Sequence, residues 1–285
     1  MKRVCVFGVI FPANLKYFND FLMSLKEQTY KDFEIVLLND GVEKLDQYIK
    51  TFSDLKFVTY NVTGTPAEIR EKGMKILISS NYEKIIFCDT DDYFSANRIS
   101  LSLDLLEKYN VVVNDVTLVN SNKELLSKLY FSNRVNDGFV FNYKFITDKN
   151  LIGFSNTSVN KQILFEVKLN AEILAVDWYF FSSITVEKNV DIVFTNQAET
   201  FYRQHSKNAV GVGAVTEEGI VKAVRVKSLH YELLSSRNDL YKELAVGFKN
   251  LSRKLRDNDY KNKYINYVKG SNLKYPLWWE EAKTY

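Results

Sequence analysis

Residues 83–92 read EKIIFCDTDD and join a short apolar run to three carboxylates. The run, residues 85–88, is long enough for a buried strand and too short for a helix. Ligands of open α/β sheets bind beyond the carboxyl ends of the strands, and Mg²⁺ takes one or two carboxylates together with substrate phosphates. Asp89, Asp91 and Asp92 therefore indicate a metal–diphosphate site, with a solvated acidic turn as the alternative.

The segments around this stretch alternate between strand and helix patterns. Residues 4–11, VCVFGVIF, are apolar throughout and predict a central strand buried on both faces. A helix over 15–28 and a strand over 34–38 follow, which makes a right-handed βαβ unit. The same patterns predict strands at 56–61, 111–119, 137–145 and 190–195, helices at 42–51, 67–80 and 99–109, a loop and short helix at 156–166, and two or three helices over 217–267.

Composition excludes several classes of protein. The chain has 285 residues, 46% of them hydrophobic, and a formal net charge of +3. This charge is too small for a nucleic-acid binder, and no apolar run approaches the ~20 residues of a membrane span. The first residues lack the pattern of a signal peptide. Cys5 and Cys88 lie in apolar runs without zinc spacing, so we expect buried free thiols in a reducing cytoplasm.

Two later segments carry candidate chemistry. Asp177 is the single carboxylate of the apolar stretch 176–181, VDWYFF. Burial would raise its pKa and suit it to be a general base, and a helix N-cap is the alternative. Residues 202–208, YRQHSKN, predict a basic lid over an anionic substrate, or else a surface loop. The terminal PLWW, residues 276–279, is either a tail docked on the core or an anchor at a membrane interface.

Together these segments resemble the GT-A-fold glycosyltransferases of family 2, which are inverting and use nucleotide sugars. The resemblance runs from residue 4 to about residue 213 and rests first on residues 22–41, LMSLKEQTYKDFEIVLLNDG. Arg70 and Gly73 match the family's ARNxG helix, residues 89–91 its DxD motif, and residues 202–208 its YRxHxxN segment. The chain departs from the family at Ile69, Glu71, Asn39 and Val176, where the family has Ala, Asn, Asp and Glu.

The resemblance implies a mixed, mostly parallel Rossmann-like sheet flanked by helices, with a helical C-terminal extension. It divides the chain into a nucleotide-sugar half (1–95), an acceptor half (96–215) and the extension (216–285). It makes Asp177 the catalytic base and Mn²⁺ or Mg²⁺ the cofactor. The implied donor-binding residues are Phe11, Asp40, Arg70, Asp89, Thr90, Asp91, Arg203 and His205, and the implied metal ligands are Asp91, Asp89 and His205.

The implied reaction moves a sugar from a nucleotide-sugar donor to the hydroxyl of a glycan or lipid-linked glycan. The AT-rich, bacterial composition points to surface polysaccharide or glycoconjugate assembly in the cytoplasm, and peripheral contact of the C-terminal helices with the inner membrane face stays open. Two alternatives remain. A nucleotidyltransferase would carry a glycine-rich basic loop where this chain reads FPAN at 11–14. A non-catalytic binding homologue is compatible with the changes at Asn39 and Val176.

Overall fold

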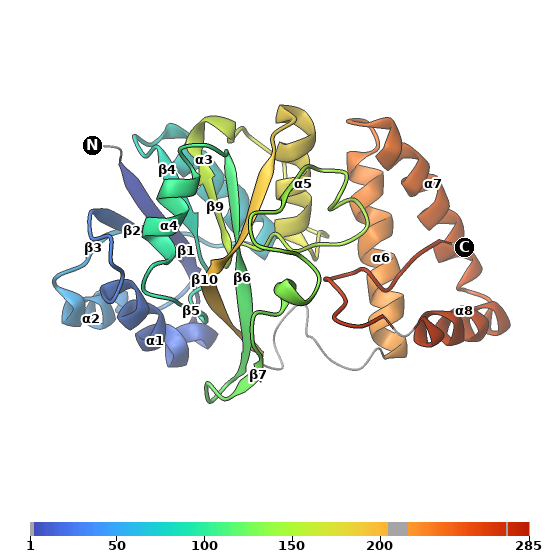
Figure 1. Cartoon of the computed structure of the whole chain (residues 1–285), viewed down its shortest axis with the longest axis horizontal. Coiled ribbons are helices and arrows are strands. Elements are labelled where there is room, and N and C mark those ends of the chain that lie inside the picture. Colours follow the sequence, from blue (N-terminus) through green and yellow to red (C-terminus); the bar gives the residue numbers. More distant parts are fainter. Residues whose placement is uncertain (1–2, 205–215, 272, 285) are drawn as a thin grey trace.

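A central sheet with helices on both faces forms the middle of the molecule, and three further helices, α6 to α8, pack beside it (Figure 1). The computed structural model describes residues 3–204, 216–271 and 273–284. The strand order is β3-β2-β1-β4-β9-β6-β10-β5, with β7 paired to β6 and β8 to β10. Strands β3, β2, β1 and β4 are parallel, as are β6 and β10. The mixed α/β fold and the helical extension predicted from the sequence are both present.

The strands are β1 Val4–Ile10, β2 Phe33–Asn39, β3 Lys56–Asn61, β4 Lys84–Phe87, β5 Tyr93–Phe94, β6 Val111–Asn120, β7 Leu125–Ser127, β8 Val140–Phe141, β9 Thr157–Asn160 and β10 Ile192–Gln204. The α-helices are α1 Leu15–Lys26, α2 Leu45–Ile49, α3 Pro66–Ser79, α4 Arg98–Leu105, α5 Val176–Lys188, α6 Glu217–Leu234, α7 Asp239–Lys254 and α8 Asn258–Gly270. Short 3-10 helices occupy Pro12–Asn14, Lys50–Phe52, Phe131–Asn133 and Lys161–Ile163.

Strand β1 is buried on both faces, as its unbroken apolar pattern predicts. Val6 and Ile10 join the core cluster under α1, which includes Phe18. Phe7 joins the larger cluster that contains α3 and α5, where it meets Phe87 edge to face at 5.9 Å. Two cores therefore lie on opposite faces of the sheet, and the carboxyl ends of its parallel strands are held rigidly between them.

Strands β9 and β10 correct two predictions. Residues 157–160, expected as a loop, form antiparallel strand β9 between β4 and β6. Strand β10 does not stop at residue 195 but continues through a register shift to Gln204. The predicted polar loop therefore begins as a strand, in which successive side chains point to opposite faces. The strand expected over 137–145 is reduced to β8, residues 140–141.

The terminal residues return from α8 toward the sheet (Figure 1). Trp278 and Trp279 are 8% and 5% exposed, so the docked tail is confirmed and the membrane anchor is wrong. Cys5 and Cys88 are free and buried, as expected, and burial raises the pKa of both thiols. Over the described part of the chain, no helix is long and apolar enough to cross a bilayer.

Candidate active site

Asp92 anchors the acidic loop that follows β4. It is 1% exposed and accepts hydrogen bonds from the hydroxyl of Ser155 and, at 2.7 Å, from the backbone N–H of Arg203. Burial raises its pKa, and the negative charges of Asp91 and Asp89 raise it further. The side chain of Asp92 thus ties the loop to β10 and leaves Asp89 and Asp91 as the more exposed carboxylates.

Thr90 is the second anchor of this loop. It is fully buried, donates from its hydroxyl to the carbonyl oxygen of Val9 at 2.8 Å, and accepts from the amide of Asn14 at 3.2 Å. Thr90 was predicted as a donor-binding residue; its side chain is bonded to β1 and the helical turn after it. The side chain of Thr90 thereby positions the loop, and a donor contact of this residue stays a prediction.

Arg70 lies beside Asp89 at the edge of the sheet. Its Nη2 is 2.5 Å from Oδ1 of Asp89, and its guanidinium lies over the ring of Phe154 at 4.4 Å. Helix α3 approaches β1 closely at Gly73, where an added Cβ would lie 2.4 Å from the ring of Phe7. This close packing sets Arg70, one turn earlier, against the acidic loop. Its Nη1 is buried and has no hydrogen-bond partner among the described residues.

Asp177 stands in the first turn of α5. The N-cap is Ala175, so the capping alternative for Asp177 is wrong; its Oδ1 accepts from the backbone N–H of Trp178 at 2.7 Å. Burial raises the pKa of Asp177 to about 6. The hydrogen bond from Trp178 lowers this pKa, the negative charge of Asp89 raises it, and the positive charge of Arg70 lowers it. A carboxylate that titrates near neutral pH is suited to proton transfer.

One cavity brings the predicted base and the acidic loop together. Asp177 and Asp89 both line it, although they are far apart in the sequence and come from α5 and the loop after β4. An added Cβ at Gly153 would lie 3.6 Å from Oδ2 of Asp177, so the glycine leaves room in front of that carboxylate. The remaining lining residues are Asn150, Phe154, Ser155, Asn156, Tyr202, Trp278 and Trp279.

Asp40 and Phe11 follow the ends of β2 and β1 at the same edge. Phe11 is 38% exposed, and Asp40 donates its backbone N–H to the carbonyl of Ile10. Asn39, which departs from the family, donates from its amide to Val42 O and to Asn61 Oδ1, both at 3.0 Å. A carboxylate could not donate these bonds. The change at Asn39 therefore stabilises the turn that presents Asp40.

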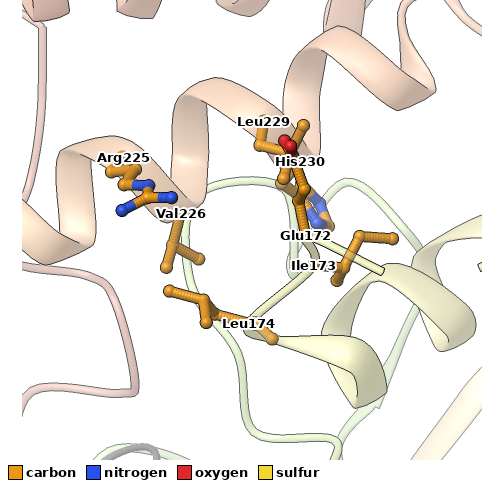
Figure 2. A pocket seen from close by; sticks show the side chains of 8 residues that line it. Glu172, Ile173, Leu174, Arg225, Val226, Leu229 and His230 are labelled. Atoms are coloured by element: carbon orange, nitrogen blue, oxygen red, sulfur yellow. The ribbon is translucent and has the colours of Figure 1, made fainter. Parts of the chain in front are cut away.

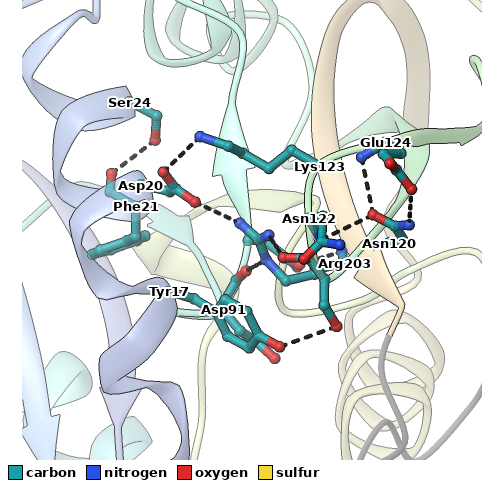
Figure 3. A network of polar contacts seen from close by, with 12 residues as sticks. Tyr17, Asp20, Phe21, Ser24, Asp91, Asn120, Asn122, Lys123, Glu124 and Arg203 are labelled. Carbon is teal, nitrogen blue, oxygen red and sulfur yellow. Dashed lines mark hydrogen bonds and ion pairs between the residues drawn. The ribbon is translucent and has the colours of Figure 1, made fainter.

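Arg203 does not reach over the predicted diphosphate site. It is 1% exposed, and its guanidinium donates to Asp20 Oδ2, Ser121 O and Asp91 O at 2.8–2.9 Å (Figure 3). Because Arg203 lies in β10 with its side chain toward α1, its predicted role as a lid cation is wrong. It holds the backbone of the acidic loop instead. His205, predicted as a donor and metal ligand, lies outside the described residues.

Comparisons with known proteins identify the family of the chain. Residues 9–166 match the model of glycosyl transferase family 2. The chain belongs to this family. An uncharacterized glycosyltransferase of Rickettsia bellii is 33% identical over 92 residues, which are 31% of this chain and 13% of that protein.

Solved structures show the GT-A fold at low identity. S. aureus TarS 1-349 superposes with a TM-score of 0.62 at 15% identity, over 92% of this chain and 74% of that one. The mannosyltransferase PcManGT of Pyrobaculum calidifontis, in complex with GDP-Man and Mn²⁺, gives 0.57 at 12% identity, over 83% and 65%. The fold that family 2 membership implies is therefore the fold observed.

The acidic loop of this family 2 protein offers two carboxylates, Asp89 and Asp91, to a divalent cation. Oxygen atoms of the substrate would complete the coordination of that cation. Burial raises the pKa of Asp89; the charge of Arg70 opposes this shift and that of Asp91 adds to it. Over the described ranges, no group of three or more His, Cys, Asp or Glu side chains could hold a metal ion. Two carboxylates with phosphate oxygens make up the set that Mg²⁺ and Mn²⁺ accept.

Helix α6 of the extension supports the helix that carries Asp177. His230 stacks on Trp178 with ring centroids 3.9 Å apart. Burial lowers the pKa of His230 to about 3, and the charge of Lys227 lowers it further. Figure 2 shows His230 beside a small hollow between α6 and the segment that leads into α5, where Leu174 faces Val226. The extension thus fixes the direction in which α5 enters the site.

Sequence reasoning missed the aromatic part of the site. Phe154 beneath Arg70 carries no motif, and neither Tyr202 of the YRxHxxN segment nor Trp278 of the PLWW tail was predicted to line the site. The terminal Trp pair indicated that the tail docks on the core, but the sequence did not indicate which part of the core it contacts. Alternation along β10 could have separated Tyr202 from Arg203, had the strand been predicted to extend so far.

Proposed function

We propose that this protein is an inverting glycosyltransferase that uses a nucleotide-sugar donor. The observation that carries the proposal is the shared cavity of Asp177 and Asp89, in which a carboxylate of raised pKa faces the acidic loop at the strand ends. Family 2 membership and the GT-A fold support the same reaction class. The shared cavity and the family match are independent observations.

The donor would lie across the carboxyl ends of β1, β2 and β4. Phe11, partly exposed, offers a face for the base, and Asp40 a carboxylate for the nucleoside. Asp89 and Asp91 would hold Mn²⁺ or Mg²⁺, which when bound offsets the negative charge of the diphosphate. The buried Nη1 of Arg70 lacks a partner among the described residues and is a donor for a phosphate oxygen.

Asp177 would act on the acceptor. It takes the proton of an acceptor hydroxyl while the oxygen of that hydroxyl forms a bond to the anomeric carbon. The bond from this carbon to the diphosphate oxygen breaks, and its electron pair leaves with the nucleoside diphosphate. Attack from the face opposite the leaving group inverts the configuration. The raised pKa of Asp177 makes it a stronger base than an exposed aspartate.

The acceptor class follows from weaker observations. The proposal of a glycan or lipid-linked glycan acceptor in surface polysaccharide or glycoconjugate assembly rests on the AT-rich, bacterial composition of the chain. Exposed Val246 and Tyr267, on basic helices α7 and α8, support peripheral contact with an anionic membrane face in the cytoplasm.

A thermal-shift panel tests the donor site. UDP, GDP, CMP and dTDP are each added with and without Mn²⁺, because a ligand that binds the folded state raises its apparent stability. The expected result is a metal-dependent shift with one nucleotide and slow hydrolysis of the matching nucleotide sugar. No shift with any nucleotide, and no hydrolysis, would contradict catalysis and favour a binding homologue.

A further inference from the structure

The C-terminal strap, residues 273–284, reaches the cavity that Asp177 lines. Trp278 and Trp279 of the strap contribute to this cavity together with Asp89 and Asp177. The strap lies outside residues 9–166, the part of the chain that matches the family model. Its contribution to the site is therefore a feature of this chain beyond the matched region.

The strap is fixed to the body of the protein. Glu280, 4% exposed, forms two hydrogen bonds of 3.0 and 3.1 Å with the guanidinium of Arg134. Trp278 exchanges both backbone hydrogen bonds with Asn150, at 2.8 and 3.1 Å. The hydroxyl of Tyr130 donates to the carbonyl of Pro276 at 2.9 Å. Anchors on both sides of Trp278 make the strap a wall of the site.

The wall is aromatic and carries one unused donor. The Trp278 ring lies 5.6 Å from that of Tyr202 and meets Phe131 edge to face at 4.9 Å. Trp278 is 92% buried, and its indole N–H has no hydrogen-bond partner among the described residues. An unpaired buried donor is costly, and such a group in a native structure calls for an explanation. Because Trp278 lines this cavity, we take a ligand hydroxyl as the partner of this N–H.

The charges around the cavity select its ligand. Asp89 and Asp177 line it, and no Lys, Arg or His is among its lining residues in the described chain. Arg70, the cation paired with Asp89, is not among the lining residues, so the diphosphate belongs on the Arg70 side of Asp89 and not in this cavity. An apolar aromatic face with a few hydrogen-bonding groups suits a neutral polyhydroxylated ring.

We propose that the C-terminal strap forms the acceptor subsite, with Trp278 donating its indole N–H to a hydroxyl of a carbohydrate acceptor. The proposal rests on the proposed function, since it takes Asp177 as the base. It makes the strap a determinant of acceptor specificity. A site built to bond a hydroxyl rejects analogues that lack it.

The test is Trp278→Phe, which keeps an aromatic ring and removes the N–H. Wild type and variant are titrated with methyl β-glucoside, methyl β-galactoside and methyl N-acetyl-β-glucosaminide by ligand-observed NMR. Loss of one hydrogen bond should weaken the bound glycoside roughly three- to tenfold. Inorganic phosphate should not compete. Equal affinity in both proteins, or no glycoside bound by wild type, overturns the proposal.

Stability separates this role from a structural one. Trp178→Phe is the matched control, because the Trp178 indole N–H donates to Ile146 O at 2.8 Å and its loss should destabilise the protein. Trp278→Phe removes an unpaired N–H and should leave the unfolding temperature unchanged or higher. A lowered unfolding temperature with unchanged glycoside binding gives Trp278 a packing role only. If Trp278 proves to have a packing role only while nucleotides with Mn²⁺ still stabilise the wild type, this inference is overturned and the proposed function stands.

Discussion

At the scale of the residue, Asp177 is the most direct test of the chemistry. Asp177→Asn keeps an oxygen to accept from Trp178 N–H but cannot take a proton. Glycosyl transfer should fall about 10²- to 10⁴-fold while nucleotide affinity stays constant. Asp191→Asn, an exposed carboxylate just after α5, is the control and should be silent. Near-normal turnover in Asp177→Asn would remove it as the base.

The pH profile of the wild type gives a second reading of the same residue. The base must be ionised, and the pKa of Asp177 is raised to about 6. The rate should therefore rise about tenfold per pH unit below pH 6 and level off above it. A profile flat down to pH 4.5 would contradict this assignment.

Arg70 should contribute to donor affinity. Arg70→Lys loses the planar guanidinium that lies over Phe154 and pairs with Asp89. We expect nucleoside-diphosphate affinity to fall roughly tenfold or more, measured by calorimetry with Mn²⁺. Lys75→Met is the matched control on the exposed face of the same helix, where the Lys75–Glu71 pair is worth little. Equal losses in both variants would contradict a specific role of the Arg70 guanidinium in donor binding.

Motif positions alone could place some of these residues but not others. Asp89, Arg70 and Asp177 match motif positions of glycosyltransferase family 2, and the fold brings them together. Thr90 and Arg203 follow the same motifs, yet their side chains are bonded to β1 and α1. Which face of the backbone a side chain takes depends on strand extent, which short motifs do not record.

At the scale of the element, the sequence predicts those helices and strands whose formation depends mainly on their own residues. Helix α3 begins at Pro66 behind a capping box of Thr65 and Glu68, and β1 to β3 follow their apolar runs. Strand β9 reads TSVN and has no apolar alternation to reveal it. Strand β9 forms because its backbone pairs with both β4 and β6, which is an effect of tertiary structure.

The strap is an element whose anchoring can be measured. Glu280→Gln removes the charge that pairs with Arg134 and accepts from Leu277 N–H. Because Glu280 is buried, the free energy of unfolding should fall by about 1–3 kcal/mol, and proteolysis after residue 273 should become faster. Glu217→Gln, in an exposed pair with Lys261, should change stability by less than about 1 kcal/mol. Equal stability of the two variants would show that the strap is not held at Glu280.

At the scale of the whole molecule, the helical extension packs against helix α5 behind Asp177. His230 of α6 stacks on Trp178, and Tyr231 of the same helix donates from its hydroxyl to Thr147 O at 2.9 Å. The strap then returns from α8 and lines the cavity that contains Asp89 and Asp177. The extension therefore supports α5 from behind and supplies a wall in front, and neither contact could be predicted from helical periodicity.

This junction should make the protein sensitive to mild acid. His230 has an ordinary pKa of 6.5, lowered to about 3 by burial, with Lys227 as the nearby cation. The unfolded chain therefore binds a proton between pH 6.5 and 3 that the folded protein excludes. Stability from this group is complete above pH 6.5 and falls by about 1.4 kcal/mol per pH unit below it.

His230→Phe keeps a ring on Trp178 and has no proton to bind. Its free energy of unfolding, compared with wild type by urea titration at pH 7.5, 6.0 and 5.0, should lose less with acid than wild type does. Parallel pH curves for the two proteins would show that His230 is protonated in the folded state without cost.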